Sequence, residues 1–120
     1  MRSVDWILRA EAITLFVGGV IAYVQLDGNP LWLLPLLLAP DLSMIGYIRG
    51  PSLGAITYNL VHNLAVALLL LAVGWLAAIT PLALGGAVLV AHVGMDRSLG
   101  YGLKLRTDFR DTHLGRIGRG

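Results

Sequence analysis

Four stretches of the chain are almost continuously apolar, and each is long enough to cross a lipid bilayer. A membrane-spanning helix needs about 20 residues, and the four stretches cover residues 4–26, 31–48, 54–79 and 82–103. The connections between them are short and contain Gly, Pro, Asn or Ser residues, which end one helix or begin the next. Short connections make consecutive helices antiparallel neighbours. The pattern therefore predicts an all-α integral membrane protein with an up-down four-helix transmembrane bundle.

Composition supports this membrane assignment, because 57% of the 120 residues are hydrophobic and only 13% are charged. A soluble domain of this length cannot bury so much apolar surface. We expect residues 1–104 to form the transmembrane domain and residues 105–120 to form a short basic cytoplasmic tail. The first stretch carries Arg9 and Glu11 and lacks a cleavage site of small residues, so it is not predicted to be a signal peptide. The sequence has no cysteine, which excludes thiolate metal sites and thiol nucleophiles.

Basic residues outside the helices lie on one side of the predicted bundle. Arg2 precedes the first helix and Arg49 follows the second, whereas connections 27–30 and 80–81 have no Lys or Arg. The positive-inside rule then predicts a multi-pass protein with both termini in the cytoplasm. Nucleic-acid binding is not expected, because the tail is short and lipid competes for it. We expect its basic side chains to bind acidic headgroups: Lys104, Arg106, Arg110, Arg116 and Arg119.

Ionisable residues gather in one layer of the predicted bundle. Counting about 1.5 Å of rise per residue places five of them in the cytoplasmic half, whereas the outer half is almost entirely Leu, Val, Ala, Ile and Gly. A charged residue at the centre of a lipid-facing helix costs roughly 2.5–3.5 kcal/mol, so these side chains are expected to face one another. Ionisable residues within a membrane are candidates for function. We therefore predict a catalytic cluster of Glu11, Asp41, His62, His92 and Asp96.

Helical spacing supports this convergence. Tyr58 and His62 are four residues apart, and so are His92 and Asp96, so each pair shares a helix face. Asn59 lies three residues before His62 on the same side. A carboxylate four residues from a histidine can orient the imidazole ring and fix its tautomer, as it does around metals and general bases. The simplest alternative is that His92 and Asp96 only satisfy one another.

The second apolar stretch contains two prolines, Pro35 and Pro40, each of which removes a helical hydrogen bond. Asp41 therefore follows a predicted kink. The kink either opens a pocket beside the carboxylate or only bends the helix around its neighbour. Polar residues near the ionisable groups are predicted to bind substrate, and they are Ser43, Tyr47, Tyr58, Asn59 and Arg97.

Several motifs resemble those of a known family. They are "PDLSMIGY" at 40–47, "GAITYNLVHN" at 54–63, "AHVGMDRSLGYGLK" at 91–104 and "FRDTHLG" at 109–115. Together they resemble a family of small bacterial four-helix membrane proteins known only as a domain of unknown function, of the DUF4260 type. The resemblance implies the four-helix fold and a bacterial inner membrane, but no reaction. It also places "THLG" in the motif set, which makes His113 a candidate third histidine of the site.

The chemistry of these residues favours a metal-dependent membrane hydrolase. His62 and His92 with a carboxylate from Asp41, Glu11 or Asp96 form a sufficient ligand set for a divalent metal such as zinc. Water bound to such an ion can attack a lipid ester, amide or phosphate. The predicted metal ligands are His62, His92, Asp41 and His113. The predicted partners are the lipid bilayer and a lipid or small polar substrate.

Three other hypotheses stay open at the level of sequence. A metal-free relay of acid and histidine side chains can move a proton or a small solute, and it would need a homo-oligomer to line a path. A b-type haem protein would use His62 and His92 as axial ligands, although Asp41 and Asp96 make an apolar haem slot awkward. A purely structural network would fix the register of the helices. Whether the protein is an enzyme is therefore left open by the residues alone.

Overall fold

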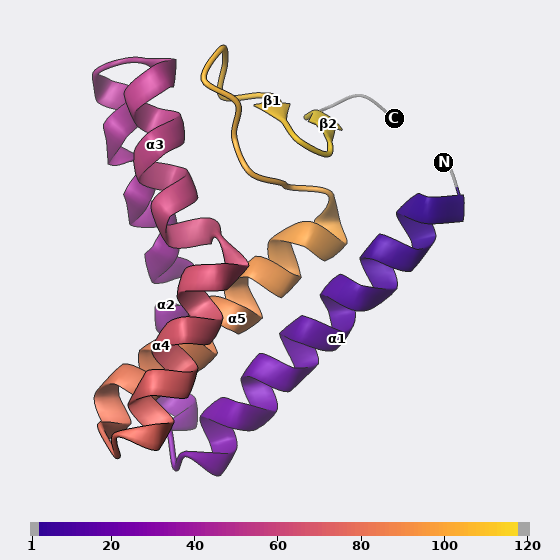
Figure 1. Cartoon of the computed structure of the whole chain (residues 1–120). Coiled ribbons are helices and arrows are strands. Elements are labelled where there is room, and N and C mark those ends of the chain that lie inside the picture. Colours follow the sequence, from indigo (N-terminus) through magenta and orange to yellow (C-terminus); the bar gives the residue numbers. More distant parts are fainter. Residues whose placement is uncertain (1–2, 118–120) are drawn as a thin grey trace.

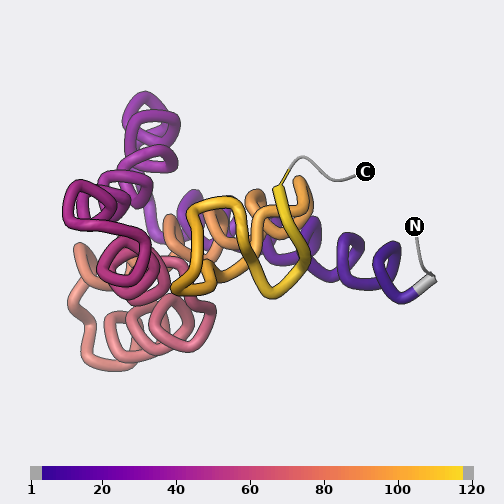
Figure 2. The backbone as a smooth tube through the Cα atoms, turned by 90° about the horizontal axis from the view of Figure 1, so that it is seen from above, coloured from indigo at the N-terminus to yellow at the C-terminus, as the bar shows by residue number. Residues whose placement is uncertain are grey.

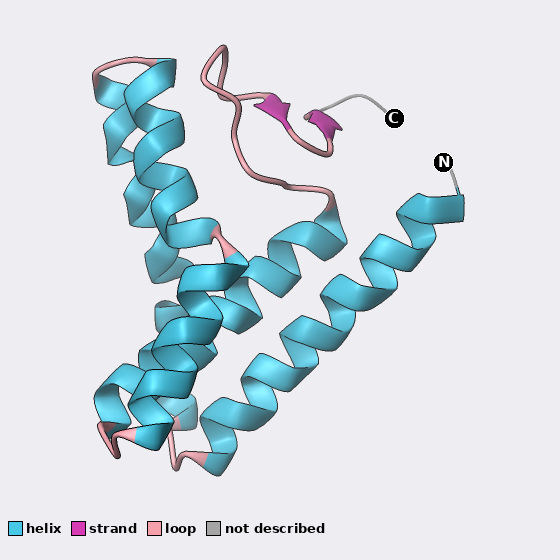
Figure 3. Cartoon of the chain, in the orientation of Figure 1, coloured by secondary structure: helices cyan, strands magenta, loops and turns pink. Residues whose placement is uncertain are grey.

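The computed structural model of the chain describes residues 3–117, most of which are helical (Figure 3). Two short strands, β1 (Asp111–Thr112) and β2 (Gly115–Arg116), follow the helices. Arg2 and Arg119, which contribute to the predicted orientation and basic tail, lie outside the described residues. The helices in chain order are α1 (Ser3–Gln25), α2 (Pro30–Leu38), the 3-10 helix η1 (Ala39–Ile48), α3 (Pro51–His62), α4 (Leu64–Leu76) and α5 (Thr80–Leu99).

Four segments are long and apolar enough to cross a membrane, as the hydrophobic pattern predicts. They are Val4–Gln25, Pro30–Ile48, Pro51–Leu76 and Thr80–Leu99. The all-α membrane fold class is thus confirmed. The fourth segment is the central one, since half of it is buried inside the protein, against at most 17% of the other three. It packs against both α1 and α4 (Figure 1).

Two glycines allow this central helix to approach its neighbours closely. A Cβ atom at Gly19 of α1 would overlap the backbone of Ala91, and a Cβ atom at Gly86 of α5 would overlap the backbone of Leu71 in α4. Membrane helices associate through such close packing, because lipid offers no hydrophobic driving force between them. The two contacts hold α1 and α4 against α5.

The second membrane segment changes from an α-helix to a 3-10 helix at Ala39. Pro40 has no N–H group, so it cannot continue the α-helical pairing. The ten residues Ala39–Ile48, which include Pro40, form η1, and this is long for a 3-10 helix. The change of helix type produces the interruption predicted before Asp41.

The third membrane segment is two helices rather than the single helix expected over 54–79. Asn63 has an extended backbone between α3 and α4, with φ −96° and ψ 143°. Its side-chain amide donates to the carbonyls of Asn59 and Leu60, and its side-chain oxygen accepts from the amide of Val66. One asparagine therefore caps the end of α3 and the start of α4.

The fourth segment ends at Leu99, four residues before the predicted boundary at 103. Gly100 adopts a left-handed conformation with φ 94°, which terminates the helix. The tail then folds back across the end of the bundle toward α3 (Figures 1 and 2). Within the tail, β1 pairs with β2 in antiparallel fashion, and Lys104 forms a bridge with Thr112.

Candidate metal centre

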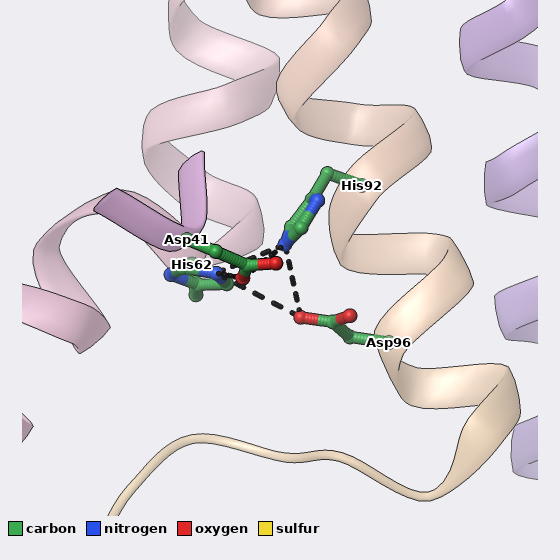
Figure 4. Close-up of side chains that lie close together, drawn as sticks. All are labelled: Asp41, His62, His92 and Asp96. Carbon is green, nitrogen blue, oxygen red and sulfur yellow. Dashed lines mark hydrogen bonds and ion pairs between the residues drawn. The ribbon is translucent and has the colours of Figure 1, made fainter. Parts of the chain in front are cut away.

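Four of the predicted site residues converge from three elements. Asp41 comes from η1, His62 from the last turn of α3, and His92 and Asp96 from α5 (Figure 4). Each offers one potential ligand atom, and these four atoms lie within 4.8 Å of one another. The histidines are 3% and 0% exposed, and the Asp96 side chain is 12% exposed. The Asp41 side chain is 38% exposed, so the cluster is open on the side of Asp41.

The distances within this cluster are short and similar. The Nε2 atoms of His62 and His92 are 3.0 Å apart. Asp41 Oδ1 lies 3.2 Å from His62 Nε2 and 3.1 Å from His92 Nε2. Asp96 Oδ2 lies 3.7 Å from His62 Nε2 and 3.1 Å from His92 Nε2. A regular tetrahedron with edges of about 3.2 Å has its centre about 2.0 Å from each corner, which is the usual zinc–nitrogen or zinc–oxygen distance. The four ligand atoms, which all lie within 4.8 Å of one another, depart from this regular shape and would have to close around an ion.

Backbone carbonyls fix the orientation of both imidazole rings. Nδ1 of His62 lies 2.8 Å from the carbonyl oxygen of Tyr58, and Nδ1 of His92 is hydrogen-bonded to the carbonyl oxygen of Leu37. A carbonyl oxygen only accepts hydrogen bonds, so Nδ1 carries the hydrogen in each ring. Each neutral ring then presents an unprotonated Nε2 to the centre of the cluster. This is the arrangement that metal-binding histidines use.

The sequence explains why the carbonyl of Leu37 is available to His92. In an α-helix this oxygen would accept from the amide of Asp41, and in a 3-10 helix it would accept from residue 40. Residue 40 is proline and has no N–H group to donate. The Asp41 amide does not reach Leu37 either, because a 3-10 helix pairs it with the carbonyl of Leu38. Pro40, which directly precedes the candidate ligand Asp41, thus leaves the carbonyl of Leu37 free for His92.

Polar side chains surround the four candidate ligands. Tyr58 donates to Asp96 Oδ2 across 3.2 Å, and its ring stacks on His62 with 3.6 Å between ring centroids. Ser43 Oγ lies 3.4 Å from His62 Nδ1 and donates to the carbonyl of Pro40. Arg97 donates to the carbonyl of His62 across 3.4 Å. Three of the predicted substrate-binding residues, Ser43, Tyr58 and Arg97, therefore lie at the cluster.

Lys104 is a buried cation that the sequence does not reveal. The residue is 4% exposed, and Nζ lies 3.9 Å from the ring centroid of Phe109 and 5.0 Å from that of Tyr58. Burial lowers the pKa of Lys104, while the negative charges of Asp96 and Asp41 oppose this shift. Lys104 is therefore not the exposed side chain that headgroup binding by the tail requires, because its ammonium group packs against the rings of Phe109 and Tyr58.

A family model described as a domain of unknown function (DUF4260) matches residues 5–117. The chain belongs to the DUF4260 family. The resemblance seen in the four sequence motifs is thereby confirmed. No curated protein and no solved structure matches the chain. The DUF4260 assignment supplies no reaction, so an argument about function has to start from the geometry of the site.

Two residues predicted for the site of this DUF4260 chain lie outside the cluster. Glu11 is exposed on α1, on a helix that contributes none of the four clustered side chains, so it does not close the pocket. His113 is also exposed, and its Nδ1 accepts the amide of Leu103 across 2.8 Å. Counting residues along α1 predicts how deep Glu11 lies, but depth does not determine which way a side chain faces. His113 is occupied by a contact within the tail.

Two further residues predicted to bind substrate in the DUF4260 site hold or contact the tail instead. Asn59 donates to the carbonyl of Lys104 across 2.8 Å and accepts its amide across 2.7 Å. The ring of Tyr47 packs edge-on against Phe109, with 5.2 Å between centroids. The Tyr47 hydroxyl is buried without a hydrogen-bond partner among the described residues. These contacts fix the tail over the cluster.

Proposed function

We propose that the protein is a membrane-embedded hydrolase that depends on one divalent metal ion, with zinc preferred. The ligands are His62 Nε2, His92 Nε2 and one carboxylate oxygen each from Asp41 and Asp96. One observation carries the proposal: four potential ligand atoms meet within 4.8 Å, and two of them are imidazole Nε2 atoms whose rings are oriented by Nδ1 contacts to backbone carbonyls. Imidazole and carboxylate are common zinc ligands, and four of them satisfy its preferred coordination number.

Electrostatics supports a metal ion over a single proton as the bound cation. His92 Nε2 has three neighbours at 3.0–3.1 Å, which are His62 Nε2, Asp41 Oδ1 and Asp96 Oδ2. One hydrogen on this nitrogen can point at only one of them. The other atoms would repel one another in a site of low dielectric constant. A divalent ion at the common centre attracts all four at once.

The exposed side of the cluster supports a catalytic rather than a closed structural ion. Structural zinc sites are closed, whereas catalytic sites keep a position for water or substrate. Asp41, at 38% side-chain exposure, is the ligand that water or substrate can displace. A bound divalent ion supplies Lewis-acid activation of water and of a carbonyl group. The buried ammonium of Lys104 lies on the tail side of the cluster and can stabilise negative charge.

The reaction class is hydrolysis of an acyl ester. Oxygen of water forms a bond to the carbonyl carbon, and the bond from that carbon to the ester oxygen breaks. One proton of the water passes to the leaving oxygen, which gives a carboxylic acid and an alcohol. The Tyr58 hydroxyl, which donates to Asp96 Oδ2, is the protein group placed to keep that carboxylate oriented during these steps.

The proposal includes an orientation in the membrane. The cluster and the tail lie toward the cytoplasmic side, with both ends of the chain in the cytoplasm. Arg49 lies between η1 and α3, at the connection for which the positive-inside rule favours that side. Reporter fusions at residues 1 and 120 test the orientation. A reporter active only outside the cytoplasm at either end would contradict it.

Metal analysis of the purified full chain with matched histidine variants tests the proposed function. His62→Ala and His92→Ala should each lose bound zinc and the release of fatty acid from phospholipid vesicles. His113→Ala is the matched control, because it removes the third histidine from outside the cluster and should retain both properties. Retention of zinc in the first two variants, or vesicles left intact by zinc-loaded wild-type protein, would contradict the proposal.

One observation favours a metal-free proton relay as the second candidate function. The 3.0 Å separation of the two Nε2 atoms also fits an N–H···N hydrogen bond between a protonated and a neutral histidine. In this case the protein would form a homo-oligomer and carry protons across vesicles without bound metal. Proton flux in metal-free protein, lost in His62→Ala, would support the relay over the hydrolase.

A further inference from the structure

An apolar groove of about 560 Å³ adjoins the candidate metal centre. It is lined by residues of α1, α2, η1, α4 and α5, including Leu36, Pro40, Leu70, Gly85 and Val88. Its volume falls within the range of about 300–1,000 Å³ typical of small-molecule sites. All of its walls come from segments long and apolar enough to cross a membrane.

The groove and the cluster share three places in the chain. Leu36 precedes Leu37, whose carbonyl holds His92. Pro40 precedes the candidate ligand Asp41, and Val88 lies one helical turn before His92. Residues that line the groove are therefore close neighbours of cluster residues on two separate segments.

The direction of the groove fits a lipid whose polar group lies at the cluster. The groove follows α5 from Pro81 to Leu89, about 12 Å along the helix axis. His92 and Asp96 come after this stretch, and the tail with Lys104 comes after them. A molecule entering from the tail side with its polar group at the cluster has its remaining length in the groove. Burial of an extended hydrocarbon chain there is favoured at about 0.8 kcal/mol per methylene relative to water.

We infer that the groove binds one acyl chain of a membrane lipid, which makes lipid acyl esters the substrate class of the proposed centre. This inference rests on the proposed hydrolytic function. Lys104, whose ammonium group lies 5.0 Å from the ring centroid of Tyr58, does not line the groove. The apolar lining is thus left for the hydrocarbon chain of such a lipid.

Glycine positions on two helices provide a matched pair of test variants. Gly85 lines the groove, and a Cβ atom added there meets nothing within 4 Å. A Phe side chain at this position can fill the groove without displacing backbone. Gly18 on α1 also has open space around an added Cβ, but it does not line the groove. Gly18→Phe therefore adds the same apolar bulk elsewhere on the membrane-facing surface.

The experiment uses the full chain in phosphatidylcholine vesicles that contain a phosphatidylcholine with a diazirine on one acyl chain. After illumination, peptide mapping should find the label on α5 residues 81–89 and on α2. Gly85→Phe should lose this labelling and Gly18→Phe should retain it. Gly85→Leu, with a smaller side chain, serves the same purpose if Gly85→Phe is not recovered as folded protein. Equal labelling of 81–89 in the Gly85 variant and the wild type would overturn the inference.

Zinc content measured on the same samples separates a failure of the proposed metal centre from a failure of acyl-chain binding in the groove. Zinc in all variants together with loss of groove labelling supports the substrate assignment. Zinc in all variants with unchanged groove labelling overturns the inference and leaves the proposed function intact. Absence of zinc from every sample overturns the proposed function and the substrate assignment with it, whatever the labelling pattern.

Discussion

Replacement of Asn59 by leucine should release the tail from the cluster. The Asn59 side chain makes two hydrogen bonds with the backbone of Lys104, at 2.8 and 2.7 Å. Leucine has a similar volume but can make neither bond. Each bond contributes about 0.5–1.5 kcal/mol net, so the variant should favour the open tail by about 1–3 kcal/mol. That range corresponds to about a 5- to 150-fold larger open population.

Limited proteolysis with trypsin measures this change directly. Lys104, Arg106 and Arg110 are potential cleavage sites in the tail, and cleavage of a transiently opened segment follows its open population when reclosing is fast. Asn59→Asp keeps the acceptor for the Lys104 amide but loses the donor, so it should show an intermediate rate. Leu60→Ala changes an exposed neighbour on the same helix and serves as the control. A wild-type cleavage rate in Asn59→Leu would refute the view that this side chain fixes the tail.

Three shorter predictions concern packing, the tail histidine and the metal ligands. Gly86→Ala should destabilise the detergent-solubilised protein by about 1–3 kcal/mol, since its Cβ meets the α4 backbone. Gly85→Ala is the control and should change stability by less than about 0.5 kcal/mol, because its Cβ meets nothing. Equal unfolding curves for the two variants would contradict this. Partial desolvation of the imidazole ring and the nearby Arg97 charge lower the pKa of His113. Its acceptor contact with the Leu103 amide should therefore be complete above about pH 6.5 and lost as the pH falls through the lowered pKa. The amide shift of Leu103 by NMR checks it, and a midpoint above 6.5 would count against the assigned contact. Tyr58→Phe removes the hydroxyl that donates to a candidate ligand and should weaken zinc affinity about 10- to 100-fold in a competition titration, unless that hydroxyl plays no part in orienting the carboxylate.

The sequence predicts the membrane segments well because their signal is strong and local. Long apolar runs and proline or glycine at their ends determine where helices can cross a bilayer. The break at Asn63 is different, since a polar residue in an apolar run does not show by itself whether its side chain will cap two helices. Helix spacing also predicts that His92 and Asp96 share a face, and the structure places His92 Nε2 3.1 Å from Asp96 Oδ2.

The clustered residues could be predicted only in part. Asp41, His62, His92 and Asp96 are predicted at one depth and meet in the structure, whereas Glu11 is predicted at the same depth and is exposed on α1. Depth follows from counting residues, but the rotation of each helix depends on packing between helices, which the sequence of one helix does not specify.

Contacts between the tail and residues far from it in the sequence could not be predicted. Lys104 follows the last helix in a basic stretch, a pattern that predicts headgroup binding. Asn59, 45 residues earlier, forms hydrogen bonds with its backbone, and the Lys104 side chain is buried. A pairing between a side chain and a distant backbone has no pattern in a single sequence. The same holds for the carbonyl of Leu37, which becomes available to His92 only when Pro40 changes the helix type.

X-ray absorption spectroscopy at the zinc edge, combined with elemental analysis of the purified full chain, tests the central claim most directly. The account predicts one zinc ion per chain with four nitrogen or oxygen neighbours at about 2.0–2.2 Å and the outer-shell scattering of two imidazole rings. His62→Ala should lose this signal, and His113→Ala should preserve it. Protein without stoichiometric metal after zinc supply, or bound zinc with no imidazole scattering, would contradict the assignment of His62 and His92 to a metal centre.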